Sequence, residues 1–188
     1  MTFEDLLENR RSIRRYKEQT VSLDIIKDII KDSTLAPSSG NGQPWKYIII
    51  NNQDLMKRMS DESKGNILAR IAANPDDYAK KYEGMLRNKE FNVFFNAPSL
   101  VIIFGEADLK NLYVDCALAA SYFMMSATSR GLGTCWVNLG AVIKDPGLLE
   151  EIGLPDNAQI IAPITLGYPE TIPVAPKRNE PEILRVIN

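Results

Sequence analysis

The sequence contains no histidine. Ser-His-Asp hydrolases, Cys-His proteases and His-ligated metal sites all need an imidazole, so its absence excludes these classes. Cysteine is almost as scarce: Cys116 and Cys135 are too few for a zinc cluster or a disulfide framework, and they are not spaced as a CxxC redox pair. We therefore expect no metal site. We interpret both thiols as buried apolar side chains in a reducing compartment.

An excess of basic residues is also missing. The 22 Lys and Arg residues stand against 24 Asp and Glu residues, which gives a formal net charge of −2. Nucleic-acid-binding domains usually carry a strong positive excess. No apolar run approaches the roughly 20 residues that span a bilayer, and the N-terminus shows no targeting pattern. The sequence therefore predicts a soluble, cytoplasmic protein that binds neither nucleic acid nor a membrane.

The chain has 188 residues, a length typical of one domain. Apolar runs rich in β-branched residues predict four strands, and the tail could supply a fifth that adds to a neighbouring sheet. The predicted strands are residues 45–50, 99–104, 134–139 and 158–167. Helical patterns lie between them, so the sequence favours an α/β or α+β sheet protein.

Capping residues and prolines mark where the predicted helices begin and end. The predicted helices are a short one opened by a Thr2–Asp5 capping box, one from Ser22 that ends before Pro37, two or three within residues 53–93, one from Asp108 to about Arg130, and one opened by Asp145 and Pro146. The helix ending near Arg130 is apolar nearly all round over residues 117–125. A second subunit covering one face would explain that pattern.

The segment Arg10-Arg11-Ser12-Ile13-Arg14 begins a run with five cations in eight residues. Cations at a helix C-terminus each stabilise the helix by roughly 0.3–1 kcal/mol, and one or two arginines would serve that purpose. Four are more than it requires. Because arginine binds phosphate oxygens through two parallel hydrogen bonds, the pattern favours an anion or phosphate site.

Three further segments each have an ordinary structural interpretation and a functional one. Residues 37–44 form a dense turn whose amides and hydroxyls would also suit the polar edge of a flavin. Residues 131–140 contain GxG, but they follow a helix and precede a strand, which is not the order of a Rossmann fingerprint. Lys177 and Arg178 are either solvated tail cations or a second part of the anion site.

Together and in this order, these segments resemble the flavin-dependent nitroreductase family. Arg10-Arg11-Ser12-Ile13-Arg14 is similar to its R-[RH]-S-x-[RK] motif. Pro37-Ser38-Ser39, followed by Asn41 and Gln43-Pro44-Trp45, is similar to its PSS-x-N-x-QPW segment. Gly131-Leu132-Gly133-Thr134-Cys135-Trp136 resembles the stretch that passes over the flavin ring. The resemblance covers nearly the whole chain.

The resemblance implies an α+β fold with a central, mostly antiparallel sheet flanked by helices. It also implies an intertwined homodimer with two FMN sites at the interface. Residues 1–188 would be a single FMN-binding domain. Residues 53–93 would be a variable helical excursion near the active site, and residues 169–188 an extended tail that reaches the partner subunit.

The resemblance also assigns the residues that bind FMN. Arg10 and Ser12 would hold the phosphate and ribityl chain. Arg14 would lie near the pyrimidine end of the ring, where a positive charge stabilises the anionic reduced flavin. No side chain would be catalytic, because the chemistry takes place at flavin N5. The full set of implied cofactor-binding residues is Arg10, Arg11, Ser12, Arg14, Pro37, Ser38, Ser39, Asn41, Gln43, Cys135, Trp136, Val137, Asn138, Leu139, Lys177 and Arg178.

The implied activity takes a hydride from NADH or NADPH onto flavin N5. It passes the hydride to a small electron-poor acceptor, such as a nitroaromatic, quinone, enone or flavin, by a ping-pong mechanism. The candidate residues for lining the acceptor site are Tyr78, Tyr82, Met85, Phe91, Phe94 and Phe95. One alternative is a flavin-binding protein, or a dehalogenase-like or flavin-consuming enzyme, that does not use NAD(P)H directly. A second, without the resemblance, is a non-enzymatic dimeric module whose arginines bind a phosphorylated effector.

Overall fold

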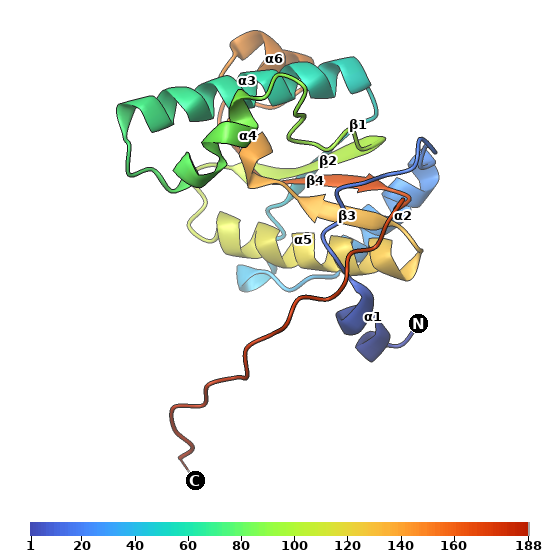
Figure 1. Cartoon of the computed structure of the whole chain (residues 1–188). Coiled ribbons are helices and arrows are strands. Elements are labelled where there is room, and N and C mark those ends of the chain that lie inside the picture. The colour runs from blue at the N-terminus through green and yellow to red at the C-terminus, as the bar shows by residue number, and fades with distance from the viewer. Residues whose placement is uncertain (188) are drawn as a thin grey trace.

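The computed structural model describes residues 1–187, and its centre is a four-stranded sheet in the order β1-β2-β4-β3 (Figure 1). All neighbouring strands in this sheet are antiparallel. The strands are β1 (Lys46–Ile50), β2 (Ser99–Glu106), β3 (Gly133–Trp136) and β4 (Ala158–Gly167). The predicted α+β fold with an antiparallel sheet is therefore confirmed.

The two central strands have both faces buried. Along β2, Val101 and Ile103 belong to the core on one side of the sheet, whereas Leu100, Ile102 and Phe104 belong to the core on the other. Successive side chains of a strand point to opposite faces, so a run of apolar residues without alternation serves a strand covered on both sides. This explains why the apolar run at residues 99–104 correctly predicted a fully buried strand.

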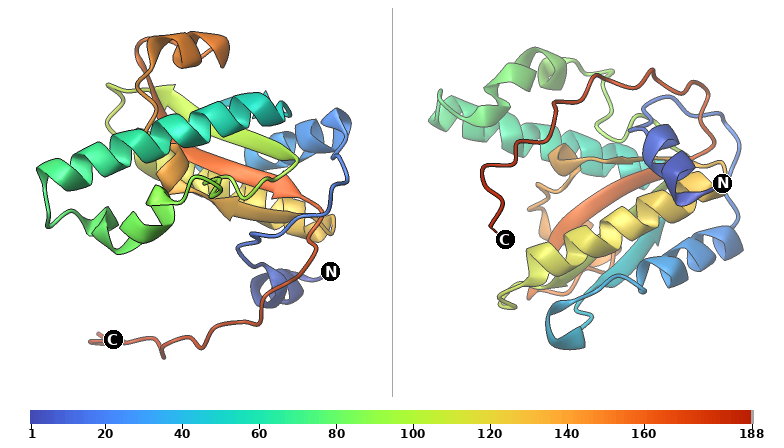
Figure 2. Two further views of the ribbon diagram at one scale, coloured as in Figure 1. Left: turned by 45° about the horizontal axis from the view of Figure 1, so that its top comes forward. Right: turned by 90° about the horizontal axis from the view of Figure 1, so that it is seen from below.

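Helices α2 (Leu23–Ser33) and α5 (Leu112–Ser129) lie side by side on one face of the sheet (Figure 2). Ile26 and Ile29 of α2 and Phe123 of α5 are fully buried in the core that they share with that face. The short helix α1 (Phe3–Asn9) lies beyond the end of this layer, next to the chain terminus (Figure 1). The expected capping box is present at its start, because Thr2 N donates to the Asp5 carboxylate and Asp5 N donates to the Thr2 hydroxyl.

The opposite face is covered by the long helix α3 (Gln53–Ala73), with α4 (Glu83–Arg87) and α6 (Pro146–Glu151) beside it (Figure 1). Met56, Met59 and Ile67 of α3 are fully buried in the second core. The short 3-10 turns are η1 (Ser39–Asn41), η2 (Tyr78–Tyr82) and η3 (Asn138–Gly140). Among the described residues, no helix combines the length and apolar character needed to cross a membrane.

Two expectations at element boundaries are wrong. The long helix does not begin at Asp108: α5 starts at Leu112 with Asn111 as its N-cap. Gly105 lies so close to the Leu112 side chain that no Cβ would fit, so residues 107–111 form the turn between β2 and the helix. The third strand ends at Trp136 instead of residue 139, because the chain then enters η3.

The tail does not supply a fifth strand in the described chain. An isolated bridge pairs Pro169 with Tyr16, and residues 170–187 are exposed without helix or strand. Figure 1 shows the tail leaving the body of the molecule. The four prolines of this segment lack the N–H groups that a regular strand donates.

Gly140 and Gly65 give a matched test of packing in the core between the sheet and α3. A methyl group at Gly140 would overlap the ring of the fully buried Phe94, whereas nothing lies near one at Gly65 on the exposed surface of α3. Gly140→Ala should destabilise the protein by about 1–3 kcal/mol through overpacking. Gly65→Ala should stabilise it by roughly 0.5–1 kcal/mol. Urea unfolding of both variants measures the two effects, and equal stabilities would contradict this packing.

Candidate functional site

The arginine-rich segment is attached directly to strand β3. Ile13 N donates to the Thr134 carbonyl at 2.9 Å, and Ser12 and Thr134 form a parallel bridge. The buried Ile13 side chain packs on Gly133, where a Cβ would lie 2.5 Å from Ile13 Cγ1. Only glycine at position 133 allows the segment to approach the strand this closely.

A partly buried tyrosine, Tyr16, connects the same segment to β4. The Tyr16 hydroxyl donates to the Ile13 carbonyl at 2.8 Å and lies 2.7 Å from the Thr165 hydroxyl, which in turn lies 3.2 Å from the Cys135 carbonyl. Burial raises the pKa of Tyr16 far above its ordinary value, so the phenol stays protonated. The Tyr16 hydroxyl therefore remains a hydrogen-bond donor at all ordinary pH values. Its hydrogen bonds help to hold residues 12–16 against β3 and β4.

The arginines of this segment have no acidic partners. None of Arg10, Arg11, Arg14 and Arg15 forms an ion pair among the described residues. Arg11 Nη1 donates to the Arg10 carbonyl at 2.7 Å, but its Nε is buried without any hydrogen-bond partner. A buried charged donor left unpaired costs free energy, so the segment is suited to receive an anion.

The tail brings another cation to the arginines. A cavity of about 460 Å³ lies between the end of α1 and the tail, and both Arg11 and Arg178 line it. Both views show the tail passing close to α1 (Figures 1 and 2). Lys177 does not line this cavity. The structure thus places one of the two predicted tail cations beside the arginine segment.

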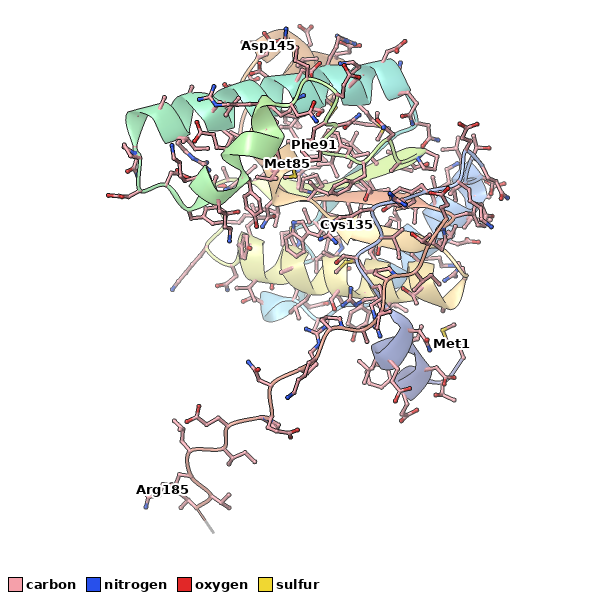
Figure 3. The ribbon with its side chains drawn as sticks, in the orientation of Figure 1. Met1, Met85, Phe91, Cys135, Asp145 and Arg185 are labelled. Atoms are coloured by element: carbon pink, nitrogen blue, oxygen red, sulfur yellow. The ribbon has the colours of Figure 1, made fainter. Side chains whose placement is uncertain are left out.

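A second cavity, of about 370 Å³, lies between the end of β3 and the helices of the 53–93 excursion. Figure 3 shows Met85 on α4 and Cys135 on β3, which contribute to its two sides. Its lining residues are Arg14, Tyr78, Tyr82, Met85, Phe95, Cys135, Trp136, Val137, Asn138 and Leu139. The cavity therefore brings together Arg14 and residues 135–139, all of which were predicted to bind the flavin.

The arginine segment reaches the floor of this cavity. Burial raises the pKa of the Cys135 thiol, while the Arg14 charge, a Ser12 hydrogen bond and the Arg10 charge all act to lower it. Burial dominates, so the thiol is neutral, and the charges of Arg14 and Arg10 act on it from nearby. Two more buried polar atoms without partners, Thr134 Oγ1 and Trp136 Nε1, belong to the same strand. A buried polar group without a partner needs an explanation, and a bound ligand would supply one for Trp136, which lines the cavity.

The loop at residues 37–43 lies elsewhere in the same chain. Ser39 N donates to the buried Asp115 carboxylate at 3.0 Å, and Asn111 Nδ2 donates to the Ser39 hydroxyl at 2.8 Å, so the loop is held at the start of α5. Ser39 and Gln43 line a cavity of about 440 Å³ that shares no residue with the one at Cys135. Within one chain, the predicted flavin-contacting loop and the arginine segment are therefore not brought together.

The loop nevertheless has a specific backbone conformation. Asn41 and Gln43 both adopt left-handed φ angles, of 56° and 46°. Gln43 N donates to the Ser38 hydroxyl at 3.0 Å, and the Gln43 side chain donates to Asn41 Oδ1 at 3.2 Å. Left-handed residues other than glycine carry strain of about 1–3 kcal/mol, which is frequent at binding sites.

Comparison with known proteins identifies the family. A model of the nitroreductase family matches residues 7–168. The chain belongs to this family.

Individual relatives extend over most of the chain. A protein of Archaeoglobus fulgidus named "Putative NADH dehydrogenase/NAD(P)H nitroreductase" is 28% identical over 173 residues, 88% of this chain and 84% of the relative. Iodotyrosine deiodinase 1 of Sus scrofa is 26% identical over 97% of this chain and 67% of its own length. The fold is shared with a crystal structure of a nitroreductase with bound FMN from Bacteroides fragilis, at a TM-score of 0.80 and 24% identity over 98% and 97% of the two chains.

Of the six residues expected to line the acceptor site of this nitroreductase-family chain, Phe91 and Phe94 do not line the cavity at Cys135. Phe94 is fully buried against Gly140, and Phe91 packs edge-to-face on Phe95, with ring centroids 6.1 Å apart. Residues 91–95 are all apolar except Asn92, so their pattern gave no signal of which aromatic ring would face the cavity. Sequence reasoning also missed Tyr16 and Thr165 as positioning residues, because 149 positions separate them.

Proposed function

We propose that this protein is an FMN-dependent oxidoreductase that uses NADH or NADPH as its electron donor and reduces a small electron-poor acceptor. When bound, FMN would accept a hydride at N5 and then pass it to a nitroaromatic, quinone, enone or flavin in a ping-pong sequence. One observation carries the proposal: a segment of unpaired arginines is hydrogen-bonded to the strand that lines an aromatic cavity. The FMN in the Bacteroides fragilis structure and the A. fulgidus relative's name support it.

Arg10, Arg11, Ser12 and the tail cations would bind the phosphate and ribityl chain. Arg11, whose Nε has no partner, lines one cavity together with Arg178 and the acidic Glu8. A phosphate there would receive charge-assisted hydrogen bonds from the two arginines. Lys177, one residue away on the tail, would add charge. The Ser12 hydroxyl is a neutral donor suited to the same group.

Arg14 and residues 135–139 would bind the ring. Arg14 lines the cavity and would offset negative charge at the pyrimidine end. Cys135, Trp136 and Val137 would provide the surface against which the ring lies. The N–H groups of Asn138 and Leu139 open the turn η3, where the first donors of a helix have no internal acceptor, so one of them is available to flavin N5.

A second copy of the chain would complete the site. On α5, Tyr113, Val114, Leu118 and Tyr122 form an exposed apolar face, and the tail exposes further apolar residues such as Ile172 and Val174. We propose that the partner covers these surfaces in an intertwined homodimer of single-domain chains. The partner's loop would then bring Pro37, Ser38, Ser39, Asn41 and Gln43 to the flavin, which explains why the loop is remote within one chain.

The second candidate is a specialised flavin enzyme that does not take electrons directly from NAD(P)H. It would be dehalogenase-like or flavin-consuming. The similarity to iodotyrosine deiodinase 1 over nearly the whole chain favours a dehalogenase as the form to test.

Absorption spectra separate the two candidates. The purified protein should show flavin peaks, and anaerobic addition of NADH or NADPH should bleach them within seconds, with the faster donor defining the preference. Peaks that persist with both donors would support the specialised enzyme instead. Protein that stays colourless after FMN is supplied would contradict both.

Removal of the phosphate contacts tests the arginine segment. The double substitution Arg10→Ala with Ser12→Ala should abolish FMN retention, since each hydrogen bond to a charged group contributes about 1.5–3 kcal/mol. The flavin-to-protein absorbance ratio after gel filtration measures the loss. Lys144→Ala, which removes an exposed cation before α6, is the control and should retain the wild-type ratio. A double variant that still purified with full FMN would refute this assignment.

A further inference from the structure

We propose that the Tyr78–Tyr82 side of the cavity at the end of β3, across from the residues assigned to the flavin ring, selects flat aromatic acceptors that carry a negative charge, and that Lys81 determines this selectivity. The proposal rests on the proposed function, because it concerns the acceptor of the same site. It names a chemical class within the broad range of electron-poor acceptors.

The shape and chemistry of the cavity walls favour an aromatic ring. Tyr78 and Tyr82 line it from η2, with their rings edge-to-face and centroids 6.3 Å apart. Phe95 and Trp136 line it from the loop before β2 and from β3. Aromatic side chains on several sides of a cavity of about 370 Å³ provide flat apolar surfaces for a planar ligand.

The charge in and around the cavity has one sign. Its ten lining residues include no carboxylate, and Arg14 is a cation among them. The Arg14 guanidinium lies over the Phe95 ring, with Cζ 5.7 Å from the ring centroid. A cation held against a ring at this distance is attracted by the ring face and loses part of its water.

Lys81 places a second cation beside the two tyrosines. Its Nζ lies 5.2 Å from the Tyr78 ring centroid and 5.0 Å from that of Tyr82. Lys81 itself does not line the cavity, but both rings do, so its charge lies next to two of the cavity's walls. An anionic substituent on an acceptor that packs against these rings would gain from this charge, whereas a neutral substituent would not.

The neighbouring cations show why Lys81 is singled out. Lys80 Nζ is paired with the Glu83 carboxylate at 2.6 Å, and Arg87 bonds the same carboxylate at 2.7 Å. Lys81 forms no ion pair with any described residue. Of two adjacent lysines on one turn, the first is therefore paired with a carboxylate, and the second has no acidic partner among the described residues.

Lys80 and Lys81 thus form a matched pair for the test. In the holoenzyme, calorimetry would measure the Kd values of 4-nitrobenzoate and its neutral analogue 4-nitrobenzamide. Steady-state assays with the preferred nicotinamide donor would measure their kcat/KM values. For each variant we would take the ratio of the values for 4-nitrobenzoate and 4-nitrobenzamide. Comparing this ratio between variants removes the difference in intrinsic reactivity of the two compounds.

We expect the wild type to bind 4-nitrobenzoate more tightly than 4-nitrobenzamide. Lys81→Gln should reduce that preference about three- to fivefold, the size of effect typical of one partly solvated charge. Lys80→Gln should leave it within about twofold of the wild type, because Glu83 already offsets that charge. High salt should weaken the preference of the wild type more than that of Lys81→Gln.

The outcomes separate this proposal from the proposed function. If a nicotinamide bleaches the flavin but Lys81→Gln retains the wild-type preference, the proposal is overturned and the oxidoreductase function stands. If the nitro compounds bind with the expected charge preference but neither is reduced, the proposed acceptor chemistry fails and the selectivity of the cavity stands. A wild type that binds the neutral compound more tightly also overturns the proposal.

Discussion

The hydrogen bond from Ile13 to Thr134 is the contact on which the site depends. It places a short, strongly cationic segment along the first residues of β3, and the fit of Ile13 on Gly133 allows no larger residue at that position. Tyr16 and Thr165 add a second attachment to β4. Since the same strand continues into the cavity, one backbone pairing positions both the anion-binding and the ring-binding parts of the site.

The separation of the 37–43 loop from this segment is the second constraint. The loop is bonded to Asp115 and Asn111 at one end of α5, and its cavity shares no residue with the one at Cys135. An exposed apolar face on the same helix and an extended tail leave the chain with surfaces that a single copy does not bury. A dimer that covers them would join the two halves of the site, so assembly and cofactor binding would be coupled.

Much of this arrangement could be predicted from local patterns. Apolar runs located all four strands, and capping residues such as Thr2 and Asp145 correctly marked helix starts, because these signals act over a few residues. The prediction that the helix begins at Asp108 was wrong because the packing of Leu112 on Gly105 decides where α5 begins. The contact between Tyr16 and Thr165, the burial of Phe94 and the unpaired state of Lys81 depend on residues far away in sequence or on neighbouring ion pairs, so no local pattern reveals them.

The central claim is that the unpaired arginines bind the phosphate of a flavin nucleotide. Calorimetric titration of the flavin-free protein with FMN and with riboflavin, which lacks only the phosphate, tests it most directly. Two charge-assisted hydrogen bonds correspond to a preference for FMN of at least about a hundredfold, and that preference should shrink as salt is added. Equal affinity for the two flavins at low salt would contradict the account.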